Sequence, residues 1–210
     1  MIKVENISVH NLDGAVRGMR NPLNSWDKSD SHWLYDIPGI TFDIGPKDLD
    51  LMRRLFKGGT EHRKYLRQVQ VSFDLSCHHI FWSEFDTYKV GVTRNSCSKM
   101  HTIHVKSFEP DDFSHEGISE VGGKYEEHFR ETLKILEELR LLFNGTHEKK
   151  YWRALLESLP MGYNLKATIT MNYENVVNII NQRTGHKIDE WNEFVEILRT
   201  LPYIEEIMRE

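Results

Sequence analysis

The chain has 210 residues, of which 39% are apolar and 28% charged, with a formal net charge of −5. This composition is typical of one folded globular domain and not of a disordered chain, and the missing basic excess argues against electrostatic binding of nucleic acid. No run approaches the ~20 apolar residues of a membrane span, and residues 1–10 lack the features of a signal peptide, so we expect no membrane contact. Cys77 and Cys97 are too few for a disulfide scaffold, which favours a reducing, cytoplasmic setting.

Alternation of apolar and polar residues predicts strands at residues 2–10, 68–76 and 163–171. Residues 101–105 are a further candidate strand. Between the first two strands, residues 11–46 show no regular pattern and contain several glycines and prolines with scattered aromatic residues. An irregular stretch of this length is unusual inside a compact domain and is often functional, and we expect its aromatic side chains to pack on the rest of the protein.

Apolar residues at helical spacing predict the remaining elements. These are a short helix opened by Pro46 and ended by Gly58-Gly59, helices at residues 79–89, 124–143, 149–158 and 174–184, and a last helix from about Asp189. The sequence has no internal repeat and no low-complexity linker. We therefore predict a single α+β domain over residues 1–210, with a mixed or antiparallel sheet flanked by long helices.

The segment from Trp82 to His101 is polar and rich in small hydroxyl residues, and it follows an apolar, strand-like run. Binding residues concentrate on loops that a rigid scaffold holds in place, but a polar segment of this kind is also an ordinary turn. From its residues alone, the ordinary turn is the preferred interpretation.

The predicted helix at 174–184 has a polar side made of carboxamides at positions i, i+3 and i+7: Asn175, Asn178 and Gln182. Amides both donate and accept hydrogen bonds, which suits the edges of heterocycles, although simple surface exposure explains them equally well. Asn172 precedes this helix and is a natural N-cap.

Other candidates for chemistry have ordinary interpretations. Cys77-His78-His79 has no second ligand pair at a zinc-like spacing, so we expect no metal site. Cys97 is more typical of a small loop thiol than of a nucleophile. Gly122-Gly123-Lys124 lacks the full phosphate-loop pattern and is expected to lead into the long helix. No residue is assigned a catalytic role.

Residues 88–100 resemble the signature of the flavin-dependent thymidylate synthases, R-H-R-x-x-S-x-N-x-x-S-x-R. The corresponding residues of this chain read Y-K-V-G-V-T-R-N-S-C-S-K-M. The polar positions of the signature are kept, as Thr93, Asn95 and Ser98. Its basic positions are changed, to Tyr88, Lys89, Val90 and Met100.

A second segment resembles the family's helical motif N-x-R-x-x-x-N-x-x-x-x-R and reads N-Y-E-N-V-V-N-I-I-N-Q-R. Asn172, Asn178 and Arg183 match that motif in type and spacing, whereas Glu174 replaces its first arginine. The order of features elsewhere agrees, because His62 stands in the place of the family's histidine after an early helix. The resemblance covers nearly the whole chain beyond residue 47.

The resemblance implies a homotetrameric enzyme that binds FAD and methylates dUMP to dTMP. Methylenetetrahydrofolate is then the carbon donor, and NADPH reduces the flavin. By this resemblance the residues that contact the cofactor are Thr93, Asn95, Asn172, Asn178 and His62. Those that contact the nucleotide are Ser98, Arg183, Tyr88 and Lys89.

The changed positions argue against efficient catalysis on an unchanged substrate. A nucleotide phosphate is held by arginine forks, and each charge-assisted contact contributes roughly 1.5–3 kcal/mol. Tyr88, Met100 and Leu156 stand where the family has arginines. The cations available to rebuild a basic site with a different geometry are Lys89, Arg94 and Lys99, or Arg63, Lys64 and Arg67.

Two alternatives to an active synthase remain open. One is a non-catalytic oligomer that binds a flavin or a nucleotide on the same scaffold. The other is a purely structural oligomer in which the asparagine-rich helix lines a subunit interface.

Overall fold

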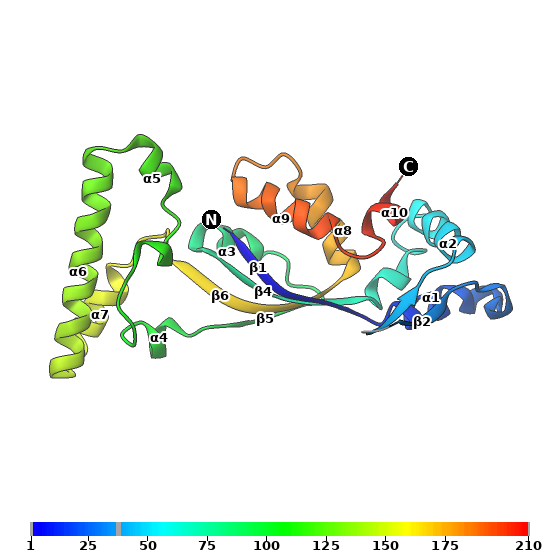
Figure 1. Ribbon diagram of the computed structural model, residues 1–210, viewed down its shortest axis with the longest axis horizontal. Helices are drawn as coiled ribbons and strands as arrows, with labels where there is room; N and C mark the ends of the chain where they lie inside the picture. The colour runs from blue at the N-terminus through cyan, green and yellow to red at the C-terminus, as the bar shows by residue number, and fades with distance from the viewer. Residues whose placement is uncertain (1, 37–38, 210) are drawn as a thin grey trace. The chain divides into compact units, whose positions relative to one another are not determined.

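The computed structural model describes residues 2–36 and 39–209 (Figure 1). In this part of the chain, one sheet has the strand order β1-β4-β6-β5. Its strands are β1 (Lys3–His10), β4 (Gln70–His78), β6 (Asn164–Asn172) and β5 (Val92–Ser96). A second, antiparallel pair is formed by β2 (His32–Asp36) and β3 (Gly39–Asp43).

The bounds of the helices complete the description of the fold. They are α1 (Leu12–Arg20), α2 (Pro46–Lys57), α3 (His79–Phe85), α4 (Lys99–Thr102), α5 (Glu116–Val121), α6 (Lys124–Thr146), α7 (Lys149–Glu157), α8 (Tyr173–Arg183), α9 (Asp189–Arg199) and α10 (Ile204–Met208). Short 3-10 turns lie at Asn21–Leu23, Trp26–Lys28, Lys64–Arg67 and Pro110–Asp112. The predicted α+β class is confirmed. Within the described residues, no helix is both long and apolar enough to pass through a membrane.

Strands β4 and β6 run antiparallel, as their side-chain partners show. The Ser72 hydroxyl donates to the carbonyl of Ile169 at 3.2 Å, and the Thr168 hydroxyl donates to the Asp74 carboxylate at 2.6 Å. The residue number therefore rises along β4 as it falls along β6, which is the pattern of an antiparallel pair. Buried and more exposed residues alternate along both strands, and this alternation is why the sequence predicted them.

The described residues form two compact units, here called unit 1 and unit 2. Unit 1 contains residues 2–3, 74–87 and 94–168. Unit 2 contains residues 4–36, 39–73, 88–93 and 169–209. The single domain over residues 1–210 stays a prediction.

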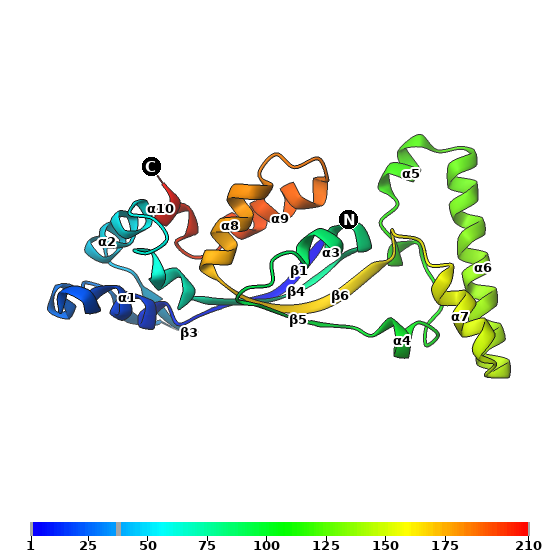
Figure 2. The same cartoon turned by 180° about the vertical axis from the view of Figure 1, so that it is seen from behind.

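Unit 1 has its helical core where α6 and α7 pack side by side (Figure 2). The buried residues of this core are Ile103, Phe113, Phe129, Leu136 and Leu155. A second buried group of aromatic rings comes from α3, where Trp82 lies edge-on to Phe85 with ring centroids 5.4 Å apart. The indole N–H of Trp82 donates to the carbonyl of Leu165 at 2.9 Å, which ties α3 to β6.

Unit 2 is built from two helix pairs, in which α8 packs on α9 and α2 packs on α10. Trp191 and Phe194 of α9 are buried, and the Phe194 ring lies 5.7 Å from that of Phe73 on β4. The apolar side of α8, Val176, Val177 and Ile180, is also buried. The helical spacing of these apolar residues is the reason the sequence predicted both helices.

The prediction of an irregular segment at residues 11–46 is wrong. Helix α1 and the β2–β3 hairpin occupy much of it, although Ile37 and Pro38, which belong to the same prediction, lie outside the described residues. In α1, Ala15, Val16 and Met19 are buried at helical spacing. Two glycines, each costing about 1 kcal/mol relative to alanine within a helix, weakened that pattern in the sequence.

The hairpin was missed because its strands are short and flank a proline. Its register places Trp33 opposite Phe42, and the two rings lie edge-on with centroids 5.1 Å apart. An aromatic cross-strand pair of this kind contributes roughly 0.2–1 kcal/mol, and neither aromatic residue marks a strand when read alone.

The predicted strand at 101–105 is also wrong, because residues 99–102 form α4. The backbone N–H and the hydroxyl of Thr102 both bond the Ser98 carbonyl, at 3.0 and 2.8 Å, and these local bonds favour a helical turn. The strand in this region is β5 instead. It was not predicted because residues 92–96 are mostly polar and show no alternation of apolar and polar residues. The helix predicted at 79–89 ends earlier, at Phe85.

Candidate functional site

In unit 2, Arg183 at the end of α8 meets Tyr88, a pair that the sequence predicted to share a substrate site. The Nε–H of Arg183 donates to the Tyr88 hydroxyl at 2.9 Å, and that hydroxyl donates to Oε1 of Gln182, also at 2.9 Å. The guanidinium group lies 4.5 Å from the ring centroid of buried Trp191. The cation is thus held on an aromatic face by residues of its own unit.

Glu174, at the first turn of α8, binds two cations that the sequence offered as candidates for a rebuilt basic site. Its carboxylate accepts hydrogen bonds from Nε of Arg63, at 3.3 Å, and from Nε of Arg67. The Glu174 side chain is 10% exposed, that of Arg63 17% and that of Arg67 49%. Two arginines and one carboxylate leave a net charge of +1, so half of the positive charge of this group is balanced within the protein.

Asn172 is the N-cap of α8, as its position predicted. Its Oδ1 accepts from the backbone N–H of Asn175 at 3.0 Å, and the side-chain amide of Asn175 donates to the carbonyl of Val90 at 2.8 Å. Gly91 has a φ of +75°, and a Cβ there would lie 2.6 Å from Nδ2 of Asn172. Glycine is therefore required at residue 91, because its φ is positive and because the side chain of Asn172 approaches its backbone closely.

Replacing Asn172 by alanine is expected to reduce the free energy of unfolding by about 1 kcal/mol, because the N–H of Asn175 loses its acceptor. Asn172→Ser is the matched control, since serine keeps a capping oxygen and should lose clearly less. Urea denaturation of the two variants measures the difference. Equal losses would show that the contact with Gly91, and not the cap, determines the effect.

Within the part of the chain that the structure describes, the remaining residues predicted for unit 2 share no side-chain hydrogen bond or ion pair. Asn178 on α8 is half-buried. The side chains of three others are exposed: His62, Lys89 and Thr93. Their roles at a cofactor or substrate stay predictions.

Strand β5 carries Asn95, which is exposed, and Arg94, which faces the opposite side because neighbouring residues of a strand alternate. The Arg94 guanidinium lies 4.1 Å from the Trp82 ring centroid and pairs with Asp86 at 2.5 Å. Ser98 follows at the start of α4 and is half-buried. Asn95 and Ser98 therefore stand at the two ends of a short polar stretch of unit 1.

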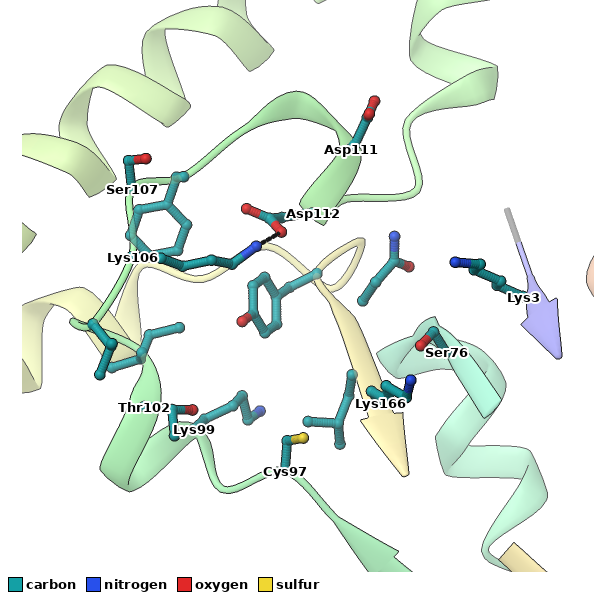
Figure 3. A pocket seen from close by; sticks show the side chains of 16 residues that line it. Lys3, Ser76, Cys97, Lys99, Thr102, Lys106, Ser107, Asp111, Asp112 and Lys166 are labelled. Atoms are coloured by element: carbon teal, nitrogen blue, oxygen red, sulfur yellow. Dashed lines mark hydrogen bonds and ion pairs between the residues drawn. The ribbon is translucent and has the colours of Figure 1, made fainter. Parts of the chain in front are cut away.

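Unit 1 contains a cavity of about 510 Å³, and the two chain neighbours of Ser98, Cys97 and Lys99, line it (Figure 3). Its lysines are Lys3, Lys99, Lys106 and Lys166. Its acidic residues are Asp111 and Asp112, and Cys97 and Tyr163 also line it. The volume lies within the ~300–1,000 Å³ typical of small-molecule sites, and the cations outnumber the carboxylates along its wall.

The lysines of this cavity have unlike partners. Lys106 pairs with Asp112, and Lys166 of β6 lies 3.4 Å from the Asp74 carboxylate. The Lys99 ammonium instead lies 2.7 Å from Nε2 of His79. Among the described residues no carboxylate pairs with Lys99, so its charge is less compensated than those of Lys106 and Lys166.

The two cysteines of unit 1 differ in exposure. Cys77 is buried on β4, and Cys97 is exposed at the cavity. Among the described residues no disulfide joins them.

The sequence did not identify most of this cavity. Lys3, Lys106, Tyr163 and Lys166 come from segments far apart in the chain, and only the fold gathers them. One signal was present, because the alternation of the predicted strand at 163–171 places Lys166 on the side opposite to buried Leu165 and Ala167.

A scan of the sequence against models of known protein families gave no match, and a search of curated proteins gave none either. Similar solved structures do exist. Thymidylate synthase X of Helicobacter pylori, crystallised with FAD and dUMP, has a TM-score of 0.68 and 19% identity over 98% of this chain and 96% of its own. A second structure of that flavin-dependent enzyme with FAD and dUMP has the same score and identity over 97% and 96%.

A third similar structure is the UMP/dUMP methylase PolB of Streptomyces cacaoi, bound with 5-Br dUMP. It has a TM-score of 0.62 and 16% identity over 95% of this chain and 89% of its own. The agreement extends over nearly the whole length of each protein, which is further than the sequence resemblance, since that resemblance covered only the chain beyond residue 47. The chain therefore has the fold of the flavin-dependent thymidylate synthases.

Proposed function

We propose that this protein binds a pyrimidine nucleoside monophosphate in the lysine-lined cavity of unit 1 and methylates dUMP with the help of FAD. The observation that carries the proposal is the cavity itself, which begins next to Ser98 of the signature-like segment and contains Lys99 and Lys166. Support for the nucleotide class comes from the similar structures, whose ligands are dUMP or 5-Br dUMP.

Lysine ammonium groups replace the family's arginines in this proposal. An ammonium binds phosphate as a point charge and lacks the planar fork of arginine, so we expect weaker and less directional binding. Lys99 stands one residue before Met100, which occupies an arginine position of the family signature. In this proposal, the positive charge that the family places at residue 100 is supplied by the preceding residue, Lys99.

The residues proposed for FAD fit its ring better than its phosphates. Thr93 and Asn95 are exposed, and hydroxyl and amide groups can donate to and accept from the edge of a flavin. Asn178 offers a further amide on the polar side of α8, while Asn172 and His62 are the remaining candidates. These residues would hold FAD, which, once reduced by NADPH, would supply the hydride that converts the methylene carbon from methylenetetrahydrofolate into a methyl group.

Nucleotide binding is tested by titrating dUMP and UMP into the protein and measuring affinity by calorimetry. Replacing Lys166 by methionine is expected to lower the affinity about tenfold or more, because one charge-assisted contact contributes roughly 1.5–3 kcal/mol. Lys134→Met is the control, since Lys134 is exposed on α6 and does not line the cavity. Equal affinities of the two variants would contradict the assignment of the cavity.

Catalysis is tested separately, by the visible spectrum of the purified protein with added FAD and by release of label from 5-tritiated dUMP in the presence of methylenetetrahydrofolate and NADPH. A flavin spectrum together with label release is the expected result. A protein that takes up no flavin and releases no label would rule out the synthase.

A non-catalytic nucleotide-binding protein is the second candidate, and one observation favours it. Three arginines of unit 2 are engaged by groups of the same unit, since Arg63 and Arg67 bind Glu174 and Arg183 binds Tyr88. This candidate is supported if dUMP or UMP raises the melting temperature while no label is released. It fails if neither nucleotides nor flavins change the melting temperature.

The proposed assembly is the homotetramer that the resemblance implies, in a reducing cytoplasmic compartment. Exposed apolar side chains on α6 would contribute to a subunit interface: Tyr125, Ile135, Leu141 and Leu142. Measurement of the mass in solution by light scattering tests the tetramer.

A further inference from the structure

Lys99 and His79 form an unusual pair of bases at the lysine-lined cavity. Nζ of Lys99 lies 2.7 Å from Nε2 of His79, and the His79 ring stacks on that of Tyr163 at an interplanar angle of 23°. Both partners of this bond are basic groups. At such a distance they share one proton, because two positive charges would repel each other strongly.

The surroundings of the pair favour its uncharged forms. Burial, Lys99, Arg94 and His78 lower the pKa of His79, so its imidazole is neutral at neutral pH and Nε2 can accept. Burial and the nearby Arg94 guanidinium lower the pKa of Lys99. The Arg94 charge acts from β5. The other titratable groups that line the cavity are Lys3, Cys97, Lys106, Asp111, Asp112, Tyr163 and Lys166.

Tyr163 adds a donor to this group. Burial, together with the neighbouring Asp112 and Cys97, raises the pKa of the Tyr163 phenol, which therefore keeps its proton at neutral pH. A protonated hydroxyl can donate a hydrogen bond to a carbonyl oxygen in the cavity. Amine, neutral imidazole and phenol are the groups that addition of an amine to a carbonyl needs.

We propose that Lys99 is a nucleophilic amine that forms a reversible imine with small carbonyl compounds carrying an anionic group. The anionic group is expected to interact with Lys106 and Lys166, which line the same cavity. A volume of about 510 Å³ accommodates a small phosphorylated aldehyde. This inference concerns the same cavity as the proposed nucleotide site but needs no synthase activity, because Lys106 and Lys166 hold the anionic group while Lys99 acts as the neutral amine.

The reaction balances without an oxidant or reductant. The Lys99 nitrogen attacks the carbonyl carbon, a C–N bond forms, and the carbonyl oxygen becomes a hydroxyl. The C–O bond then breaks and the oxygen leaves as water, which carries away the two hydrogens that the amine loses. His79, in contact with Nζ, is placed to accept a proton from nitrogen and to return it to the departing oxygen.

The probe is pyridoxal 5′-phosphate, which combines an aldehyde with a phosphate. The protein is incubated with it, the imine is reduced with borohydride, and each lysine peptide is quantified by mass spectrometry. Lys99 is expected to be modified more than Lys64 at neutral pH, because a lowered pKa raises the neutral fraction of a lysine. Lys64 is the reference because its side chain is 66% exposed.

Variants of Arg94 test the cause of the reactivity. Arg94→Gln should shift the labelling of Lys99 to higher pH, whereas Arg94→Lys keeps the charge and should leave the profile unchanged. Arg94 also packs on Trp82, so the wild-type protein supplies the decisive measurement if the glutamine variant does not fold. In the wild type, labelling of Lys99 should reach its midpoint at a lower pH than labelling of Lys64.

Lys99→Arg keeps the positive charge and removes the nucleophile, so it should abolish the aldimine absorbance of the main adduct. Pyridoxal, which lacks the phosphate, should label Lys99 less than pyridoxal 5′-phosphate does. Labelling of Lys99 no faster than that of Lys64, with the same pH midpoint, would overturn the proposal.

Discussion

Replacing Asp48 by asparagine is expected to destabilise the protein by about 3–5 kcal/mol, which is the usual cost of removing one partner from a buried ion pair. For a chain of this length the melting temperature should fall by about 10 °C. Asp48 of α2 is fully buried, and its carboxylate accepts from Nε of Arg20 at 2.5 Å. Without that charge, the buried Arg20 guanidinium has no counter-ion in the pair.

The Asp48 carboxylate also organises the chain that precedes α2. It accepts hydrogen bonds from the hydroxyls of Ser29 and Ser31, at 2.6 and 2.7 Å, and from the backbone N–H groups of Asp30 and Ser31, both at 3.1 Å. An asparagine presents an NH₂ group where one of the two carboxylate oxygens accepted. Some of these donors would then face another donor, so the loss is larger than that of the ion pair alone.

The stabilising effect of Asp48 should depend on pH. Burial raises the pKa of Asp48, but hydrogen bonds from Ser29, Ser31 and Arg20 outweigh burial, and the pKa in the folded protein lies below its usual value. A lowered folded pKa means that this stability is present above the unfolded value of about 3.9 and is lost as the pH falls through the folded value. The stability difference between wild type and Asp48→Asn should therefore shrink below about pH 4.

Asp50→Asn is the matched control, because Asp50 lies on the same helix and pairs with Arg54 while its side chain is 63% exposed. An exposed pair of this kind contributes about 0–1 kcal/mol. Urea denaturation at neutral pH and at about pH 3 measures both variants. If both variants lose the same free energy of unfolding at neutral pH, the buried contacts of Asp48 do not stabilise the protein more than an exposed ion pair does.

The cluster around Asp48 also explains why residues 11–46 could not be read from the sequence. Asp30 accepts from the backbone N–H groups of Lys47 and Asp48, at 2.9 and 3.1 Å, and so caps α2 from a distant loop. Capping by a residue far along the chain leaves no local pattern. Gly45 is also required by this contact, because a Cβ there would lie 2.4 Å from the Asp30 carboxylate.

Elements with a strong apolar period were predictable because their own packing determines them. Strands β4 and β6 and helices α6, α8 and α9 follow the alternation or helical spacing of their buried residues. Strand β5 has no such pattern and depends on β6, where the backbone N–H of Cys97 donates to the carbonyl of Lys166 at 2.9 Å. The strand propensity of a short polar segment is decided by its neighbours.

The contacts of the candidate site likewise include some that the sequence could predict and some that it could not. The family pattern assigned the motif positions Tyr88 and Arg183 to the nucleotide, and the structure brings the two side chains into contact, while their role at a substrate stays a prediction. The pairing of Lys99 with His79, and that of Glu174 with two arginines, were not predictable. Both contacts join residues from separate elements of the fold. The composition of a sequence shows that it contains cations but does not show which side chain each cation contacts.

Replacing Glu174 by glutamine is expected to create an anion-binding site in unit 2. The variant leaves Arg63 and Arg67 facing a neutral amide, so the net charge of the group rises from +1 to +2. Two guanidinium groups that converge on one point suit a phosphate or a pyrophosphate. We expect pyrophosphate to bind the variant about tenfold more tightly than the wild type, which corresponds to one charge-assisted contact.

The same variant should lose stability when no anion is present. Removing one partner of a fully buried pair costs about 3–5 kcal/mol, but Arg67 is about half exposed, so screening by water reduces the loss to about 1–3 kcal/mol. Pyrophosphate should restore part of that loss, because a ligand that binds only the folded state stabilises it. The measurement is the melting temperature with and without pyrophosphate.

Glu61→Gln is the matched control, because it removes one negative charge from the neighbouring segment while its side chain is 84% exposed. Its melting temperature should stay close to that of the wild type and should respond to pyrophosphate no more than the wild type does. If Glu174→Gln behaves like this control, the two arginines do not form an anion site when released. If only Glu174→Gln responds, the carboxylate of Glu174 occupies in this chain the place that an anionic group of a ligand would take.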